Sequence, residues 1–376
     1  MNTLKIGFIV NPIAGMGGRV GLKGTDGSAL NEAITRGAKP ISPFRATKFL
    51  RRLQSLGLES SIKLFTCPGV MGEQEAKDAR FPAKVLSLRT KKKTTAEDTK
   101  KAVRLMIKIP VNLIVFVGGD GTARDILDAL RDVNGILVLG VPSGVKMYSG
   151  IFAASPSDAA DVIEAMLKDY AQTIDLEIMD VDEEAFKRDI LSVKLYGYLK
   201  GPYVPLHLVE SKLVTIETQE EIENQIAVAK FITEQMDPDA VYILGPGTTV
   251  KRITEILGVK KTVLGVDVYR NGHLIKDVDD KTILYEINNA EKAWIIVSPI
   301  GRQGMLFGRG NQQISPEAIK RIGKERIIVV ATKGKIQSIE GGILRVDTGD
   351  PEVDNMLRGY IKVFTDYAEW RMMPVQ

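Results

Sequence analysis

Cysteine and histidine are nearly absent from this chain of 376 residues, which contains one cysteine, Cys67, and two histidines, His207 and His273. A single cysteine cannot form an internal disulfide, so the sequence favours a reducing, cytoplasmic compartment. Two histidines exclude a histidine-rich metal site and disfavour a histidine general base. Cys67 precedes Pro68 with no histidine near it, so we expect a small buried or turn residue, with a reactive thiol as the alternative.

Long apolar runs are also missing. No segment approaches about 18 consecutive apolar residues, so no membrane span is predicted, and the apolar start is shorter than a signal peptide requires. The formal net charge is only +4, which disfavours a dedicated nucleic-acid-binding protein but allows an anionic small substrate. We expect neither nucleic acid nor a membrane as partner, and we expect a homo-oligomer, either a dimer or a tetramer.

What the chain does contain is enough apolar material for two cores, since 44% of its residues are hydrophobic and domains usually hold about 100–200 residues. Residues 4–10 are predicted to form a buried strand that ends at Asn11-Pro12. Residues 112–117 contain an unbroken apolar run, as in a buried parallel strand, and lead into a glycine-rich turn. After residue 171 the pattern alternates, and strand–helix alternation then returns. The sequence predicts an α/β fold: a doubly wound, Rossmann-like parallel sheet in residues 1–172, and a mixed α/β domain in residues 173–376.

The strongest functional signal is the turn GGDGT, Gly118 to Thr122, between an apolar strand and a helix. Ligands of open α/β sheets bind beyond the carboxyl ends of strands, where glycines let the backbone approach a phosphate and the helix N-terminus favours the anion. Asp120 in this turn could accept a proton from an attacking hydroxyl or help to hold magnesium. The alternative is an aspartate that only caps the helix.

These residues carry a resemblance to known kinases. A GGDGT turn after a strand resembles the signature shared by NAD kinases and the diacylglycerol and sphingosine kinases. The element from Asn11 to Gly15 resembles the end of the first strand in those lipid kinases. The strings GGDGTARDI and GVPSGVKMYS, with LKGTDG, GRGNQQISP and VDTGD, are similar to the ATP-NAD kinase-like branch related to the acetoin-catabolism protein X. The similarity therefore spans most of the chain.

The resemblance implies transfer of a phosphoryl group from ATP or polyphosphate to the ribose 2′-hydroxyl of NAD, with Mg²⁺ as cofactor. Asp120 would be the base or the group that orients the hydroxyl. The residues implied in phosphate and nucleotide binding are Asn11, Gly15, Gly118, Gly119, Gly121, Thr122 and Arg124. The Asn-Glu or Asn-Asp pair that grips the acceptor in typical NAD kinases has no counterpart downstream of GGDGT, so the identity of the acceptor stays open.

A second turn follows the next predicted strand at Val141–Lys146, where the lipid kinases carry a Pro-x-Gly-Thr-x-Asn turn. Ser143, Gly144 and Lys146 are its candidate ligand-binding residues, and Lys146 could neutralise phosphate charge. The alternative for Lys146 is a solvated surface lysine.

Two further segments lie in the C-terminal half. The turn GPGTT between a predicted strand and helix resembles the phosphate turn of ribose-5-phosphate isomerase and sugar-phosphate sensors, and its candidate residues are Gly245, Gly247, Thr248 and Thr249. The loop GRGNQQ offers Arg309, Asn311 and Gln312 for a polar ligand, or it is a polar connection that caps the next helix.

Three functions are compatible with these patterns. The first is an NAD kinase-like phosphotransferase. The second keeps the kinase chemistry but uses a lipid or another small alcohol as acceptor, which the lack of a basic amphipathic helix disfavours. The third is a non-catalytic nucleotide or sugar-phosphate sensor, which the GPGTT turn favours and Asp120 disfavours.

Overall fold

The computed structural model describes residues 3–18, 20, 28–89, 94–133, 135–143, 147–181, 193–204 and 218–376. The chain divides into two compact units. The first comprises Met1–Met16, Gly24–Ile34 and Lys39–Lys212, and the second comprises Gly17–Lys23, Thr35–Ala38 and Leu213–Gln376. No helix of the described residues is long and apolar enough to cross a membrane.

The first unit is built on a five-stranded parallel sheet in the order β3-β2-β1-β4-β5. Its strands are β1 (Leu4–Val10), β2 (Ile62–Thr66), β3 (Ala83–Val85), β4 (Leu113–Gly118) and β5 (Leu137–Pro142). Its helices are α1 (Ser28–Thr35), α2 (Ser42–Ser55), α3 (Glu73–Ala79), α4 (Ala96–Ile107), α5 (Asp120–Leu130) and α6 (Pro156–Leu167).

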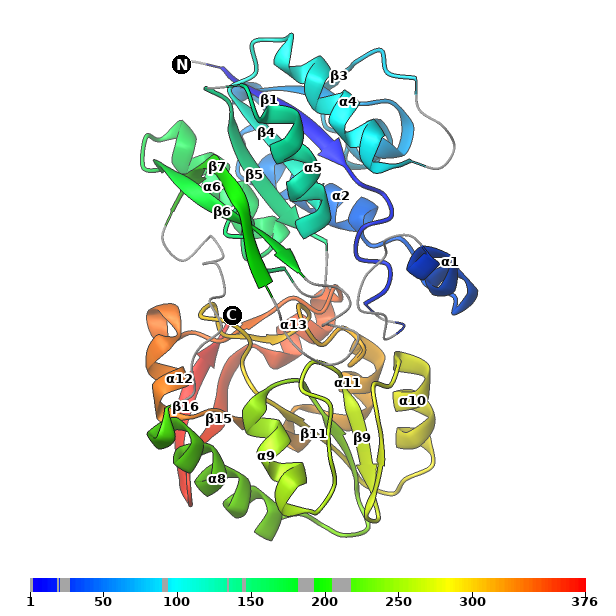
Figure 1. The fold of residues 1–376 in the computed structure, drawn as a ribbon, viewed down its shortest axis with the longest axis vertical. Coiled ribbons are helices and arrows are strands. Elements are labelled where there is room, and N and C mark those ends of the chain that lie inside the picture. Colours follow the sequence, from blue (N-terminus) through cyan, green and yellow to red (C-terminus); the bar gives the residue numbers. More distant parts are fainter. Residues whose placement is uncertain are drawn as a thin grey trace. The chain divides into compact units, whose positions relative to one another are not determined.

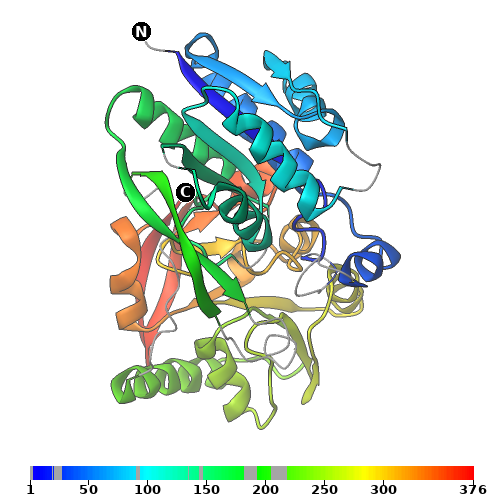
Figure 2. The same cartoon turned by 45° about the horizontal axis from the view of Figure 1, so that its top comes forward.

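Helices cover both faces of this sheet, because each parallel crossover returns through a helix. Helix α4 packs beside α5 on one face, and α2 packs beside α6 on the other (Figures 1 and 2). All six residues of β4 are buried, which agrees with the unbroken apolar run that predicts this strand. The predicted doubly wound parallel sheet is therefore confirmed.

A long antiparallel hairpin completes the first unit. Strands β6 (Gln172–Val181) and β7 (Val193–Tyr203) pair with each other, and they pack on β5 and α5 (Figure 1). The sequence places the domain boundary near residue 172, where the alternating pattern begins. The structure assigns the hairpin to the first unit instead, because its apolar residues Leu176, Ile178 and Leu199 join the core of the parallel sheet.

The second unit contains a seven-stranded mixed sheet in the order β10-β9-β8-β11-β13-β15-β16. The strands of this unit are β8 (Val241–Leu244), β9 (Asp267–Arg270), β10 (His273–Ile275), β11 (Ala293–Val297), β12 (Met305–Phe307), β13 (Ile327–Val330), β14 (Arg345–Val346), β15 (Gly359–Asp366) and β16 (Glu369–Val375). The helices are α8 (Gln219–Glu234), α9 (Thr248–Ile256), α10 (Asp280–Asn288), α11 (Pro316–Ile322), α12 (Lys333–Ser338) and α13 (Pro351–Leu357).

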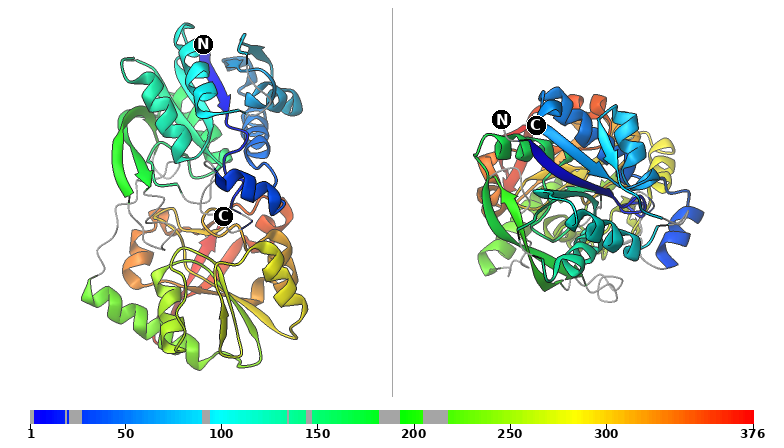
Figure 3. Two further views of the ribbon diagram at one scale, coloured as in Figure 1. Left: turned by 45° about the vertical axis from the view of Figure 1, so that its right-hand side comes forward. Right: turned by 90° about the horizontal axis from the view of Figure 1, so that it is seen from above.

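Strands β8, β11, β13 and β15 are parallel to one another. At the edges, β9 pairs antiparallel with β8, β10 pairs antiparallel with β9, and β16 pairs antiparallel with β15. Helices α8 and α9 pack against each other, and α10 packs against α11 (Figure 3). Two apolar clusters fill the unit. The prediction of a mixed α/β C-terminal domain is confirmed.

Cys67 follows β2 and is fully buried in the first core. Desolvation raises the pKa of its thiol to about 12, which supports the interpretation as a small buried residue.

At pH 8 the folded protein should react with an aromatic disulfide reagent about a thousandfold more slowly than the denatured chain, because the thiolate of Cys67 is the reacting species. Rates that agree within a few-fold, measured by stopped-flow absorbance, would contradict this burial.

Candidate functional site

The order of the first sheet creates a switch point between β1 and β4. From β1 the chain proceeds outward to β2 and β3, and it then crosses back to β4 and β5 on the other side. At such a point the loops that leave the carboxyl ends of the two central strands diverge, which opens the crevice where ligands bind in this class of sheet. Asn11 follows β1 and Gly119 follows β4, so the two strongest sequence motifs flank this position.

Asn11 joins the two loops. Its backbone N–H donates to the carbonyl of Val117 at 3.0 Å, which prolongs the pairing of β1 with β4. Its side-chain Nδ2 donates to Thr122 Oγ1 at 2.9 Å, and its Oδ1 accepts the N–H of Ile13 at 3.3 Å. Gly15 then turns the loop with a φ of 77°, a conformation that favours glycine. Asn11 and Thr122, 111 positions apart, thus form one constellation.

The two glycines that precede Asp120 have different physical roles. A Cβ on Gly118 would lie 2.6 Å from the side chain of Thr122, so glycine is required there for close packing of the strand against the helix. A Cβ on Gly119 would meet no atom within 4 Å. Among the described residues there is therefore no packing reason for glycine at position 119.

Asp120 is the first residue of α5, after the N-cap Gly119. The carboxylate accepts the N–H of Tyr148 at 2.9 Å, the N–H of Ser149 at 3.0 Å and the Ser149 hydroxyl at 2.5 Å. These bonds hold the carboxylate in one orientation and attach the segment that follows β5 to the start of α5. The Asp120 carboxylate therefore also binds the segment after β5, outside the helix that it begins.

Ser149 is a member of this constellation that the sequence does not reveal. Besides donating to Asp120, its hydroxyl accepts the N–H of Met179 at 2.9 Å, so it connects the GGDGT turn to β6. Its separation from Asp120 is 29 positions, and no spacing rule links two residues across a strand and an irregular segment. Ser149 is the last residue of the string GVPSGVKMYS, but the candidates drawn from that string are Ser143, Gly144 and Lys146.

The structure places the remaining candidates of the first unit as follows. Ser143 follows β5, donates its N–H to Gly118 at 3.0 Å, and is 1% exposed with a hydroxyl that lacks a hydrogen-bond partner. The guanidinium of Arg124 forms an ion pair with Asp180 of β6. Gly121 lies in the first turn of α5. Gly144 and Lys146 lie outside the described residues.

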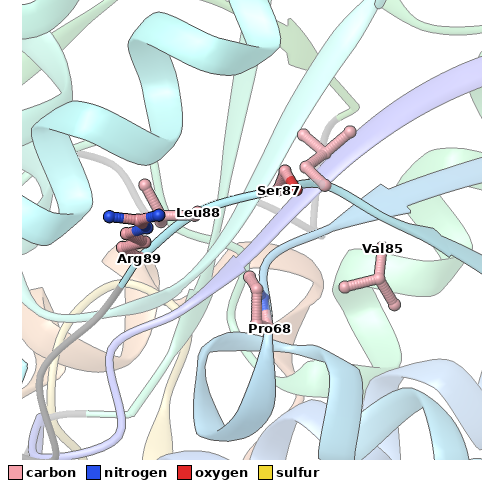
Figure 4. A pocket seen from close by; sticks show the side chains of 6 residues that line it. Pro68, Val85, Ser87, Leu88 and Arg89 are labelled. Carbon is pink, nitrogen blue, oxygen red and sulfur yellow. The ribbon is translucent and has the colours of Figure 1, made fainter.

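A hollow of about 400 Å³ lies at the same edge of the sheet, beyond β2 and β3 (Figure 4). Pro68, Val85, Leu88 and Arg89 contribute to its lining. Neighbouring strands are about 4.8 Å apart, so the end of β2 lies roughly 10 Å from the end of β4, two strands away in the sheet. That separation is within the length of one nucleotide.

The GPGTT turn of the second unit connects β8 to α9, as the sequence predicts. The N–H groups of its glycines are engaged in backbone bonds, from Gly245 to Ile296 at 2.8 Å and from Gly247 to Val263 at 2.8 Å. The expectation that these glycine N–H groups converge on a phosphate is therefore wrong. Thr248 accepts a hydrogen bond from Gln225 at 3.2 Å, and Thr249 is buried.

The GRGNQQ loop is a rigid part of the second unit. Asn311 closes it, because Oδ1 accepts the N–H of Gly308 at 3.1 Å and Nδ2 donates to Leu306 at 2.9 Å. Asn311 is thus engaged within the loop, whereas Arg309 and Gln312 are buried beside it. The side-chain oxygens of Gln312 and Gln313 have no hydrogen-bond partner. The connection ends at Ser315, whose side chain caps the next helix, with Pro316 in the first turn, as the alternative of a polar connection that caps this helix predicts.

Each of the two units matches a family profile. The ATP-NAD kinase N-terminal domain profile matches residues 6–171, and the ATP-NAD kinase C-terminal domain profile matches residues 237–375. A protein of Caldivirga maquilingensis, provisionally assigned as a LysW-aminoadipate/LysW-glutamate kinase, is 28% identical over 120 residues, which are 31% of this chain and 45% of that protein.

Two structures from Bacillus anthracis str. Sterne, described as diacylglycerol kinases (one provisionally), are each 17% identical. Each match covers 48% of this chain; it covers 44% of the first structure at a TM-score of 0.25 and 47% of the second at 0.24. The chain spans less than half the length of these three relatives.

Proposed function

The chain belongs to the ATP-NAD kinase family, and on that premise we propose that it is a phosphotransferase that moves a phosphoryl group from ATP or polyphosphate to the 2′-hydroxyl of NAD, giving NADP. Profiles of both domains of the family match, and together they span most of the chain. The family relationship supports NAD as the acceptor.

The observation that carries the proposal is the constellation at the switch point of the first sheet. Asn11 and Thr122 fix the two diverging loops to each other, and Gly119 leaves the backbone open between them. The N-terminus of α5, whose first N–H groups have no partner within the helix, adds a partial positive charge at this opening. A phosphate chain is the ligand whose charge and oxygen acceptors match such a surface.

Asp120 supplies the reactive group beside this phosphate surface. In the proposed reaction the acceptor hydroxyl oxygen forms a bond to the terminal phosphorus, the bond from that phosphorus to the leaving phosphate oxygen breaks, and the hydroxyl proton passes to the Asp120 carboxylate. Three hydrogen bonds from Tyr148 and Ser149 fix the carboxylate, so its side chain does not need to change rotamer before it accepts the proton of the acceptor hydroxyl.

Magnesium fits this site as a metal held mainly by the donor. The described residues contain no group of three or more acidic, histidine or cysteine side chains that could hold a metal ion by themselves. Mg²⁺ is commonly bound through one or two carboxylates together with substrate phosphates and water. The donor phosphates and water would supply most of its ligands, and the ion would neutralise the charge of the transferring phosphate.

We assign the hollow beyond β2 and β3 to a nucleotide base. Its lining combines the apolar side chains of Pro68, Val85 and Leu88 with the charged Arg89, which suits a flat ring attached to phosphate.

The test is an acceptor and donor screen with the full chain and magnesium. We expect NADP formation from NAD with ATP or polyphosphate, detected by an NADP-specific dehydrogenase. Diacylglycerol in vesicles and free glycerol serve as alternative acceptors, with radiolabelled phosphate as the readout. Labelling of an alcohol other than NAD would keep the phosphotransferase and overturn the acceptor, and no labelling of any acceptor would overturn the proposed function.

A further inference from the structure

Three segments of the second unit meet at the carboxyl edge of its parallel strands. One is the turn after β8 that leads into α9, another starts at Ser298 after β11, and the third leads from β13 through Thr332 into α12. Strands β8, β11 and β13 are consecutive in the sheet and parallel, so the three segments are neighbours. This is the edge at which open α/β sheets bind their ligands.

The ammonium group of Lys335 places a positive charge at this edge. Its Nζ donates to the Ser298 hydroxyl at 3.1 Å, and a Cβ on Gly247 would lie 3.9 Å from the Cβ of Ser298. Ser298 therefore stands between the amine and the turn that begins α9. An ammonium has three N–H donors, and among residues 218–376 no carboxylate forms an ion pair with this one. Lys333, two positions earlier, pairs instead with Asp366 and Glu369 at 2.8 Å each.

The charge at Lys335 is incompletely compensated. Desolvation lowers the pKa of its amine to about 8, although the field of Glu221 in α8 acts in the opposite direction. The Glu221 carboxylate accepts the Thr332 hydroxyl at 2.6 Å, and Asp366 of β15 is engaged by Lys333. An anion bound at this edge would supply the negative charge that Glu221 and Asp366 do not provide to Lys335.

The start of α9 offers donors to the same place. The N–H groups of a first helical turn have no partners within the helix and carry a partial positive charge. Gly247, with a φ of 119°, turns the chain into this helix of 9 residues. Thr249 is 3% exposed, and its hydroxyl makes no hydrogen bond to any residue that the structure describes. This hydroxyl can therefore donate to a ligand at the start of α9.

We propose that Lys335, Ser298 and the Thr248–Thr249 start of α9 form a binding site for a phosphate monoester dianion, independent of the phosphotransfer site at Asp120. The two negative charges of the phosphate would match the ammonium and the helix N-terminus. Its oxygens would accept hydrogen bonds from the amine, the hydroxyls and the free N–H groups. The site makes the second unit a receptor for a phosphorylated metabolite.

Calorimetric titration of the full chain with inorganic phosphate, ribose 5-phosphate and AMP tests the proposal. Binding of at least one probe should weaken about tenfold or more in Lys335→Met, the scale of losing one charge-assisted hydrogen bond. Methionine removes the charge and keeps a side chain of similar length, so folding should persist, as circular dichroism would verify. Lys333→Gln is the matched control, because Lys333 belongs to the same segment but is paired at the surface, and it should bind as the parent does.

Proton uptake provides a readout that a purely structural lysine would not give. Because a bound dianion favours the charged amine, binding at pH 8.5 should take up a proton, seen as a dependence of the binding heat on the ionisation enthalpy of the buffer. Gly119→Val should leave this binding unchanged, which separates the site from the first unit. Absence of binding of all three probes, equal binding by the parent and Lys335→Met, or binding abolished by Gly119→Val would each overturn the proposal.

Discussion

Asp120→Asn should lower turnover by roughly a hundredfold or more, the scale of losing a general base. The amide cannot take up a proton from the acceptor hydroxyl. It also places an NH₂ group where the carboxylate accepts the N–H groups of Tyr148 and Ser149, so one of these bonds is lost as well. The measurement is the turnover number at saturating donor and acceptor, together with the thermal unfolding midpoint.

Ser149→Ala is the control that separates the chemistry of Asp120 from its structural role. It removes the hydroxyl bonds to Asp120 and Met179 but keeps the carboxylate, so it should cost about 1–2 kcal/mol of stability and much less turnover than Asp120→Asn. If turnover falls in proportion to stability in both variants, the role of Asp120 is only to attach the segment after β5 to the start of α5.

Gly119→Val should raise the dissociation constant for the phosphate donor at least about tenfold while leaving the unfolding free energy within about 1 kcal/mol of the parent. The reason is that a Cβ at this position meets no protein atom, whereas it would occupy the space through which a phosphate reaches the backbone N–H groups. Equilibrium titration with a non-hydrolysable ATP analogue measures the first quantity, and urea denaturation measures the second.

Gly118→Ala is the matched comparison one position earlier. There the new Cβ would lie 2.6 Å from Thr122, so the variant should lose stability by about 1–3 kcal/mol through overpacking. Unchanged donor affinity in a folded Gly119→Val protein would exclude this turn as the phosphate surface. Comparable destabilisation of the two variants would contradict the packing difference between the glycines.

The sequence by itself determined the elements around the first site. The buried run at β4 and the glycines and helix that follow it are local signals, because apolar periodicity and turn chemistry act over a few neighbouring residues. They sufficed to predict the parallel sheet, the strand-to-helix position of GGDGT and the similar position of GPGTT. They also placed Asn11 and Asp120 beyond strands of one sheet, and hence at one edge.

Only the tertiary structure decided which side chains meet at these edges. The bonds from Ser149 to Asp120 and from Lys335 to Ser298 span 29 and 37 positions, and they depend on how strands order themselves in a sheet. The same holds for the β6–β7 hairpin, whose alternating pattern predicts strands but not the core they join. Burial is a property of the whole fold, so the lowered pKa of Lys335 and the open space at Gly119 follow from packing that local sequence does not specify.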